Sequence, residues 1–196
     1  MIEPVEVERV EREKAEVVLL RSVKRGAEHP LELCCSHRSE ADQLAFAVRS
    51  IDLLPRRLDF ALSATQEGLV VRGETESALD SPVEILRSVY GDAVRIGTPT
   101  IRYRRGPVVQ EPHMGVRVMC STEHFYSVRD DMESRDAVIL DALVATHHGV
   151  LRVTVPLARL MGYSQYVARL TSGSARDVIW FSHYAPVVQP PPRPAA

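Results

Sequence analysis

The chain has 196 residues, 45% of them hydrophobic, and its 24 Lys and Arg residues against 26 Asp and Glu residues give a formal net charge of −2. This length can bury two small hydrophobic cores or one core of medium size. The near-neutral charge excludes the global basic field that drives nonspecific binding to nucleic acids. DNA is therefore not an expected partner, and any contact with RNA has to be local.

The sequence shows no sign of export. No apolar run reaches the length needed to cross a bilayer, and the first residues, Met-Ile-Glu-Pro-Val-Glu, lack the basic and apolar blocks of a signal peptide. The cysteines Cys34, Cys35 and Cys120 are odd in number and two are direct neighbours, which argues against a disulfide framework. We expect a cytoplasmic protein with no membrane partner.

The N-terminal extension, residues 1–30, is dense in alternating Glu and Arg. Such a stretch is compatible with a strand at a sheet edge and with a short solvated helix, and its periodicity does not decide between them.

Residues 31–105 alternate between strand and helix patterns. Ser39 and Asp42 form a capping signal that opens a helix, and Gly91 supplies the stop of a second one. The expected buried face of the first helix carries Ala41, Leu44, Ala45, Val48 and Ile51. In order, the predicted elements are a strand 31–36, a helix from 39 to 54, a hairpin 58–63 and 69–73, a helix 79–90, and a strand 93–96 that residues 101–104 could extend.

After a linker at residues 106–112 the same order returns in residues 113–185. Its predicted elements are a strand 114–120, a helix 122–135, a hairpin 138–146 and 150–155, a helix 157–170 and a strand 178–184. Residues 186–196 hold five prolines and predict a disordered tail, because they cannot bury themselves.

Both halves thus predict the order βαββαβ, which packs two helices on one face of a four-stranded antiparallel sheet. The expected fold class is α+β, with two consecutive ferredoxin-like sandwiches that share a layout and not a sequence.

From Glu111-Pro112 onward the second half resembles the last domain of translation elongation factor G. The matching motifs keep the order and nearly the spacing of that family, so the set is specific. They are Asp-Met-Glu-Ser-Arg at 131–135, Val-Pro-Leu-Ala at 155–158, Gly-Tyr at 162–163, Leu-Thr-Ser-Gly at 170–173 and Phe-Ser-His-Tyr at 181–184.

Residues 31–105 resemble the third domain of the same factor, through Ser-Glu-Ala-Asp-Gln at 39–43 and Gly-Thr-Pro at 97–99 ahead of Ile-Arg-Tyr-Arg at 101–104. Both family domains have the βαββαβ layout. The sequence contains no Gly-x-x-x-x-Gly-Lys-Ser/Thr phosphate loop, so the resemblance implies a protein without the factor's GTPase, second and tip domains.

The resemblance also implies where RNA or a partner would bind. In the family, the end of the last domain's second helix faces the sarcin-ricin loop of ribosomal RNA, which assigns this role to Arg169, Thr171 and Ser172. The family's Leu-Arg-Ser-x-Thr is Val-Ala-Arg-Leu-Thr at 167–171 here, so the arginine is displaced by about 100° around the helix. Arg135 joins the set, because the family's Arg-Arg-Gly is Arg-Asp-Ala at 135–137.

Arg102, Arg104 and Arg105 form the densest basic run of the chain, beside Tyr103. On a strand, Arg102 and Arg104 would share one face. Two interpretations stay open: the run binds phosphate, or its charges protect an edge strand from aggregation.

The remaining motif residues are expected to be structural, because glycine permits a tight turn and a buried tyrosine ring leaves its hydroxyl to find a partner. They are Gly162, Tyr163, His183 and Tyr184. Cys34 and Cys35 point to opposite faces of a strand, which predicts one core thiol and one half-exposed thiol instead of a metal site. We expect no catalytic residue, no metal and no cofactor.

The leading hypothesis is a non-catalytic, elongation-factor-G-like protein that binds the ribosome or a translation factor in an accessory or regulatory role. Its partner would be ribosomal RNA near the factor-binding site or a translation GTPase. The alternative is a protein-interaction or small-ligand module on a double ferredoxin-like scaffold without ribosome contact, since a fold does not fix a function. The sequence leaves the oligomeric state open.

Overall fold

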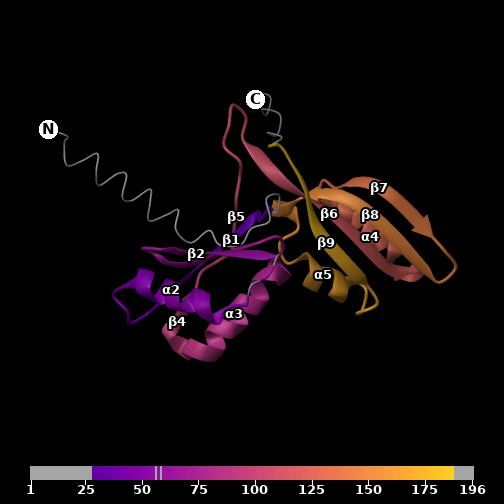
Figure 1. Cartoon of the computed structure of the whole chain (residues 1–196). Coiled ribbons are helices and arrows are strands. Elements are labelled where there is room, and N and C mark those ends of the chain that lie inside the picture. The colour runs from indigo at the N-terminus through magenta and orange to yellow at the C-terminus, as the bar shows by residue number, and fades with distance from the viewer. Residues whose placement is uncertain (1–27, 56, 58, 188–196) are drawn as a thin grey trace, which may run out of the picture. The chain divides into compact units, whose positions relative to one another are not determined.

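The computed structural model describes residues 28–55, 57 and 59–187. Most of the predicted N-terminal extension and of the predicted tail lies outside these residues. The chain divides into two compact units, Met1–Thr100 and Ile101–Ala196. Each unit contains one antiparallel sheet with helices packed against it (Figure 1).

Unit 1 has the predicted order of elements. Its strands are β1 (Leu31–His37), β2 (Phe60–Thr65), β3 (Gly68–Gly73) and β4 (Val94–Ile96), and its helices are α2 (Gln43–Leu53) and α3 (Glu76–Tyr90). The short helix η1 (Gly91–Ala93) leads from α3 into β4. The strands lie in the order β2-β3-β1-β4, and β5 (Thr100–Ile101) also pairs with β1. Residues 101–104 therefore do not form the predicted strand, because β5 ends at Ile101.

The core of unit 1 follows from alternation along β1, whose Leu31, Leu33 and Cys35 are buried. Asp42 caps α2 by accepting a hydrogen bond from the Ala45 N–H at 3.0 Å. The predicted buried face of α2 is wrong, because Val48 is 39% exposed.

Helix α2 instead buries Phe46, Ala47 and Ser50. The Ser50 hydroxyl is 2.8 Å from the Phe46 carbonyl and 3.2 Å from the Tyr90 hydroxyl. These bonds satisfy the serine inside the core, so a polar residue can occupy the buried face.

Unit 2 repeats the order with longer strands. They are β6 (Gln110–Ser121), β7 (Val138–Val144), β8 (His148–Pro156) and β9 (Arg176–Pro186), in the order β7-β8-β6-β9. Helices α4 (Thr122–Ser134) and α5 (Tyr163–Leu170) pack with them, and a short helix η2 (Leu157–Arg159) precedes α5. The two ferredoxin-like α+β sandwiches predicted from the sequence are therefore confirmed.

One face of the unit 2 sheet forms the core. Val116 and Val118 of β6 are buried there, beneath Phe125 of α4 and Tyr163 of α5. Gly149 allows this close packing, because a Cβ at that position would overlap the ring of Phe125.

Three predicted boundaries differ from the structure. Strand β6 begins at Gln110, so the last residues of the predicted linker 106–112 belong to the sheet. Strand β9 continues to Pro186, because that residue pairs with Gln110. The predicted helix 157–170 is interrupted at Gly162, which has a φ of 74° that glycine adopts without strain. Within the described residues, no helix is long and apolar enough to span a membrane.

Candidate nucleic-acid interface

Thr171, the C-cap residue of α5, is buried. Its hydroxyl donates a hydrogen bond to the Val167 carbonyl at 2.7 Å and accepts one from the Ala175 N–H at 3.1 Å. The hydroxyl therefore closes the helix end, and its side chain is not presented to a partner, in contrast to the role implied by the resemblance.

Arg169 and Ser172, at the same helix end, are exposed. Ser172 has a φ of 49° and Gly173 a φ of 79°, and the Gly173 N–H donates to the Ala168 carbonyl at 2.7 Å. This left-handed pair ends the helix and turns the chain. Arg169 makes no ion pair with another described residue, so its guanidinium is available for an anion.

Arg135 is held inside unit 2 by several contacts. Its Nε lies 2.8 Å from Oδ2 of Asp131, and one terminal nitrogen donates to the Arg159 carbonyl at 2.7 Å. Its guanidinium carbon lies 5.0 Å from the ring centre of Tyr163 and 4.9 Å from that of Tyr166. Arg135 thus fastens α4 to η2 and α5, and these contacts oppose the RNA-binding role that the resemblance implies.

Tyr163 lies beneath the guanidinium of Arg135, as expected for a structural residue. Its side chain is fully buried, and its hydroxyl makes no hydrogen bond within the described part of the chain. Burial raises the pKa of the Tyr163 hydroxyl, and the nearby Asp131 carboxylate raises it further. The group therefore stays protonated and neutral inside unit 2.

The Arg102, Arg104 and Arg105 run lies in a turn ahead of β6. The backbones of Arg104 and Gln110 exchange two hydrogen bonds of 3.0 Å, which close a short hairpin. The Arg104 guanidinium lies 4.1 Å from the ring centre of Tyr184. Arg102, Arg104 and Arg105 are all exposed. The predicted shared strand face for Arg102 and Arg104 is wrong, because only Arg104 forms a bridge here.

Tyr184 and His183, two of the predicted structural residues, lie on β9. The Tyr184 hydroxyl is 3.4 Å from the Arg102 carbonyl. His183 stacks on His113 of β6, with ring centres 5.3 Å apart and an interplanar angle of 25°. Burial lowers the pKa of His113, and the second ring of the stack lowers it further, while Glu111 acts in the opposite direction.

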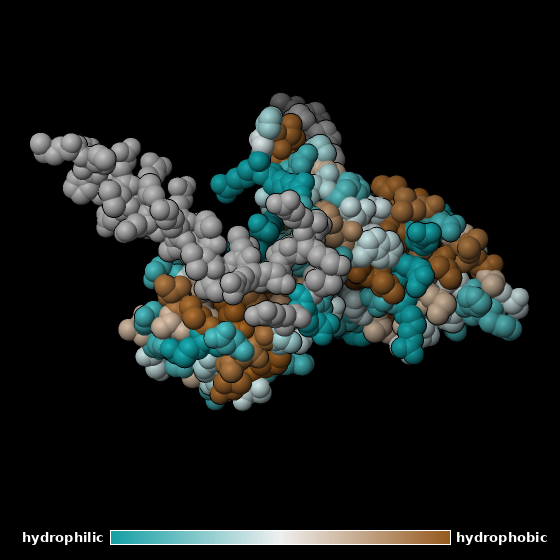
Figure 2. All heavy atoms as spheres, viewed as in Figure 1, coloured by the Kyte–Doolittle hydropathy of each residue, from teal (hydrophilic) through white to brown (hydrophobic). Residues whose placement is uncertain are grey.

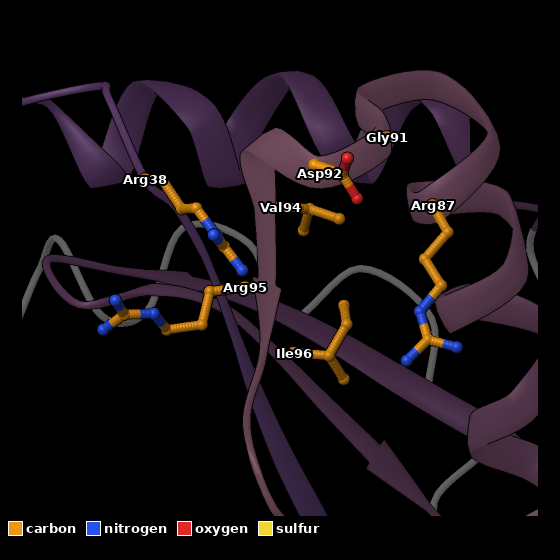
Figure 3. A pocket seen from close by; sticks show the side chains of 7 residues that line it. All are labelled: Arg38, Arg87, Gly91, Asp92, Val94, Arg95 and Ile96. Atoms are coloured by element: carbon orange, nitrogen blue, oxygen red, sulfur yellow. The ribbon is translucent and has the colours of Figure 1, made fainter.

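Unit 1 contains a hollow of about 430 Å³ that sequence analysis missed. Arg38, Arg87 and Arg95 line it together with Asp92. Arg38 is distant in sequence from Arg87, Asp92 and Arg95, and only the fold brings it close to them. Figure 3 shows that the three guanidinium groups point in different directions, so the hollow does not focus positive charge on one point.

The environments of the three cysteines disfavour the reactive thiolate form. Burial raises the pKa of the Cys35 thiol to about 12, and it also raises the pKa values of Cys34 and Cys120. As predicted, Cys35 is in the core and Cys34 is half-buried. Among the described residues, no group of His, Cys, Asp and Glu side chains is arranged to hold a metal ion.

Comparison with known proteins assigns unit 2. Residues 108–193 match the family model described as Elongation factor G C-terminus. The resemblance of the second half to the last domain of elongation factor G is therefore confirmed. The chain is 38% identical over 82 residues to the mitochondrial ribosome-releasing factor 2 of Danio rerio and 33% identical over 82 residues to elongation factor G of Gluconobacter oxydans.

These matches cover 42% of this chain in both cases, but only 11% and 12% of the two relatives. The chain therefore spans about a tenth of the length of the curated relatives it matches. A crystal structure of a protein from Thermus thermophilus aligns with a TM-score of 0.57 over 84% of this chain and 41% of the other, at 15% identity. At that identity the alignment establishes a shared fold.

Proposed function

We propose that this chain binds the ribosome, or a translation factor that acts on it, in an accessory or regulatory role and without catalysis of its own. The observation that carries the proposal is the match of residues 108–193 to the C-terminal domain of elongation factor G. The relatives are named elongation factor G and ribosome-releasing factor 2, and these names support a role in translation.

The contacts of unit 2 support Arg169 as the residue through which the helix end meets RNA. It is exposed, and no other described residue neutralises it. Ser172 lies beside it on the exposed turn. A guanidinium forms bidentate, charge-assisted hydrogen bonds with phosphate. The bonds of Arg135 to Asp131 and Arg159 support leaving Arg135 out of this proposed surface.

Nucleotide hydrolysis is not part of the proposed role. None of the 196 residues form a Gly-x-x-x-x-Gly-Lys-Ser/Thr loop, whose backbone N–H groups would cradle phosphates. The GTPase activity of a translation factor therefore has to come from another domain or polypeptide. Saturable, stoichiometric binding of GTP to this chain would contradict the proposal.

Co-sedimentation with purified ribosomes across a salt series tests the proposal. We expect Arg169→Glu to weaken binding by about 1–3 kcal/mol, because a phosphate contact is lost and repulsion is gained. We also expect a shallower dependence on salt, because fewer counterions are released.

The matched control is Arg87→Glu. Arg87 is an exposed arginine in the last turn of α3, the equivalent helix of unit 1. If Arg169→Glu binds as the wild type does, with the same salt dependence, the helix end is not the contact.

A second candidate function, a protein-interaction module, is favoured by strand β7. This strand lies at the edge of its sheet and exposes large apolar side chains. They are Val138 at 62%, Leu140 at 61%, Leu143 at 61% and Val144 at 46%. Apolar spheres gather over this side of unit 2 in Figure 2. An exposed apolar edge strand can pair with a strand of a protein partner.

The two candidate functions predict different effects of the same variant, Leu143→Glu. If the chain is a protein-interaction module without ribosome contact, the wild type and Leu143→Glu should both fail to co-sediment with ribosomes, and a protein partner bound through β7 should be lost in Leu143→Glu with little effect of added salt, since apolar contacts release no counterions. If ribosomes bind through Arg169, Leu143→Glu should bind them as the wild type does.

A further inference from the structure

The sheet of unit 2 has a second face, opposite to the one that forms the core. Along β6, Val116, Val118 and Cys120 are buried, whereas Arg117 and Met119 between them are exposed. This alternation is that of a strand with one solvated side. The exposed side chains of the four strands therefore form one continuous surface, which we call the open face.

Basic side chains lie side by side on the open face. Arg117 of β6 is directly opposite Arg152 of β8, and Arg176 of β9 is opposite Met119, two positions along from Arg117. All three arginines are exposed, and none of them makes an ion pair with another described residue. Like charges directly opposite each other on neighbouring strands destabilise a sheet, so this arrangement costs stability and stabilises no contact within the unit.

An aromatic ring lies next to these charges. Trp180 of β9 is opposite Gly115 of β6, and a Cβ at Gly115 would overlap the indole. The glycine thus lets the ring lie across the neighbouring strand. The indole is half-exposed. It is the only tryptophan of the chain.

Apolar side chains continue the surface between the arginines. Met119 is 44% exposed and Val178 is 49% exposed. Val178 is opposite Arg117, so the apolar and basic positions interleave across β6 and β9. Asp141 on the edge strand β7 is opposite Arg152, which is in turn opposite Arg117 and then Val178. It is the one carboxylate among these four cross-strand neighbours.

We propose that the open face binds unpaired RNA. Arginines on three neighbouring strands supply the charge complementarity to a phosphodiester backbone, and the Trp180 indole supplies a platform on which a base stacks. Proteins that bind single-stranded nucleic acids combine these two features. Four-stranded sheets of this topology class use stacked aromatic residues in this way.

An acidic protein surface would also meet the arginines, but it would leave the accessible part of the Trp180 indole without a stacking partner. This inference goes beyond the proposed function. It concerns a different surface from Arg169, and it can be measured with free RNA and no ribosomes.

Trp180 provides a direct readout. The full chain is titrated with an unlabelled oligouridylate while the intrinsic tryptophan fluorescence is recorded. We expect saturable quenching, because a stacked base contacts the indole. Quenching should weaken steeply with salt, because phosphate contacts release counterions. Absence of quenching at low salt would overturn the proposal.

Variants measured by the anisotropy of a labelled oligouridylate separate the two features. Trp180→Leu should weaken binding roughly tenfold, the order expected for one lost stacking contact. The double variant Arg117→Ala and Arg152→Ala should also weaken binding, and it should reduce the slope of log K against log salt by about 1.4, or about 0.7 for each lost phosphate contact.

The control is the double variant Arg38→Ala and Arg95→Ala, which removes the same charge from exposed positions of unit 1. Equal weakening by both double variants would show that net charge alone acts, and would overturn the assignment to the open face. Circular dichroism confirms that each variant is folded.

Poly-glutamate is the competing ligand. If it binds as tightly as the RNA and Trp180→Leu leaves RNA binding unchanged, the face takes an acidic protein and the proposal is wrong. If the chain binds ribosomes but not oligouridylate, this inference is wrong and the proposed function is unaffected. The reverse result would remove the proposed function and leave the open face as an RNA site.

Discussion

The central strand pairs of the two sheets carry different charges at equivalent places. In unit 1, β1 and β3 place Glu32 opposite Arg72, and Nε of Arg72 lies 2.7 Å from Oε2 of Glu32. In unit 2, β6 and β8 place Arg117 opposite Arg152. Each pair joins the first and third strands of its βαββαβ unit. One topology therefore carries an ion pair in unit 1 and, in unit 2, two opposed arginines of which Arg152 also has the carboxylate of Asp141 as a cross-strand neighbour.

The third strand of each unit also differs in burial, and the strand of unit 1 is the more buried one. In unit 1 the neighbouring residues Leu69, Val70 and Val71 of β3 are all buried, so both faces of that strand are covered. In unit 2 the residues between the buried ones of β8 stay accessible, and Arg152 is exposed. The sheet of unit 1 is therefore covered along β3, whereas the sheet of unit 2 keeps one accessible face along β8.

The largest effect on stability is expected when the contacts of Arg135 inside unit 2 are removed. Arg135→Ala should lower the free energy of unfolding by roughly 2–3 kcal/mol, because it leaves the Asp131 carboxylate and the Arg159 carbonyl without their partner. Arg129→Ala is the control, since its exposed i,i+4 pair with Glu133 contributes about 0.5 kcal/mol or less. Urea unfolding measures both variants.

The account requires folded Arg135→Ala protein to keep its affinity for ribosomes. A variant that is as stable as the wild type but no longer binds would restore Arg135 to the interface and contradict its structural role.

A smaller effect is expected when the charge arrangements are exchanged. Arg117→Glu gives unit 2 the acid–base pair of unit 1, because Arg117 is opposite Arg152 on one side and Val178 on the other. It should raise the free energy of unfolding by about 0.2–1 kcal/mol. Glu32→Arg gives unit 1 two opposed arginines and should lower it by a similar amount. Thermal unfolding followed by circular dichroism tests both changes. If neither variant changes stability in the stated direction, the two pairs are energetically equivalent and the contrast has no physical basis.

The smallest expected effect is a pH dependence at the stacked histidines. The folded state lowers the pKa of His113 below its ordinary value of 6.5, so the unfolded chain binds this proton more readily. The contribution of His113 to stability is therefore present above pH 6.5 and is lost as the pH falls below it.

The measurement is the melting temperature at about pH 7.5 and about pH 5.5, on either side of the ordinary histidine pKa. His113→Gln should reduce its fall with acid, whereas His147→Gln, at an exposed turn, should not. An unchanged pH dependence in His113→Gln would mean that other groups account for it.

The order of elements could be predicted because it depends on local patterns. Alternating apolar residues mark β6, and the N-cap Asp42 and the C-cap Gly91 mark helix ends that the structure reproduces. The buried face of α2 could not be predicted from apolarity, because Ser50 is buried through hydrogen bonds to Phe46 and Tyr90. Tyr90 lies 40 residues away in sequence.

The candidate site was predicted less well, because a family motif matches residue types and does not show whether a side chain is exposed. Thr171 and Arg135 belong to the family motifs, but contacts with Ala175 and Arg159 make them structural. The open face was missed for a different reason. Alternation predicts that Arg117 points outward, but its position opposite Arg152 depends on the register of two strands that are distant in sequence.

The central proposal is that the chain binds the ribosome, or a translation factor that acts on it, through the end of α5 in unit 2. The most direct measurement is the binding of the labelled full chain to purified ribosomes while elongation factor G is added in a trapped, ribosome-bound form. The account predicts that elongation factor G displaces the chain in proportion to its occupancy, with Arg87→Glu behaving as the wild type and Arg169→Glu binding more weakly from the start. Undiminished binding of the chain to ribosomes saturated with elongation factor G would contradict it.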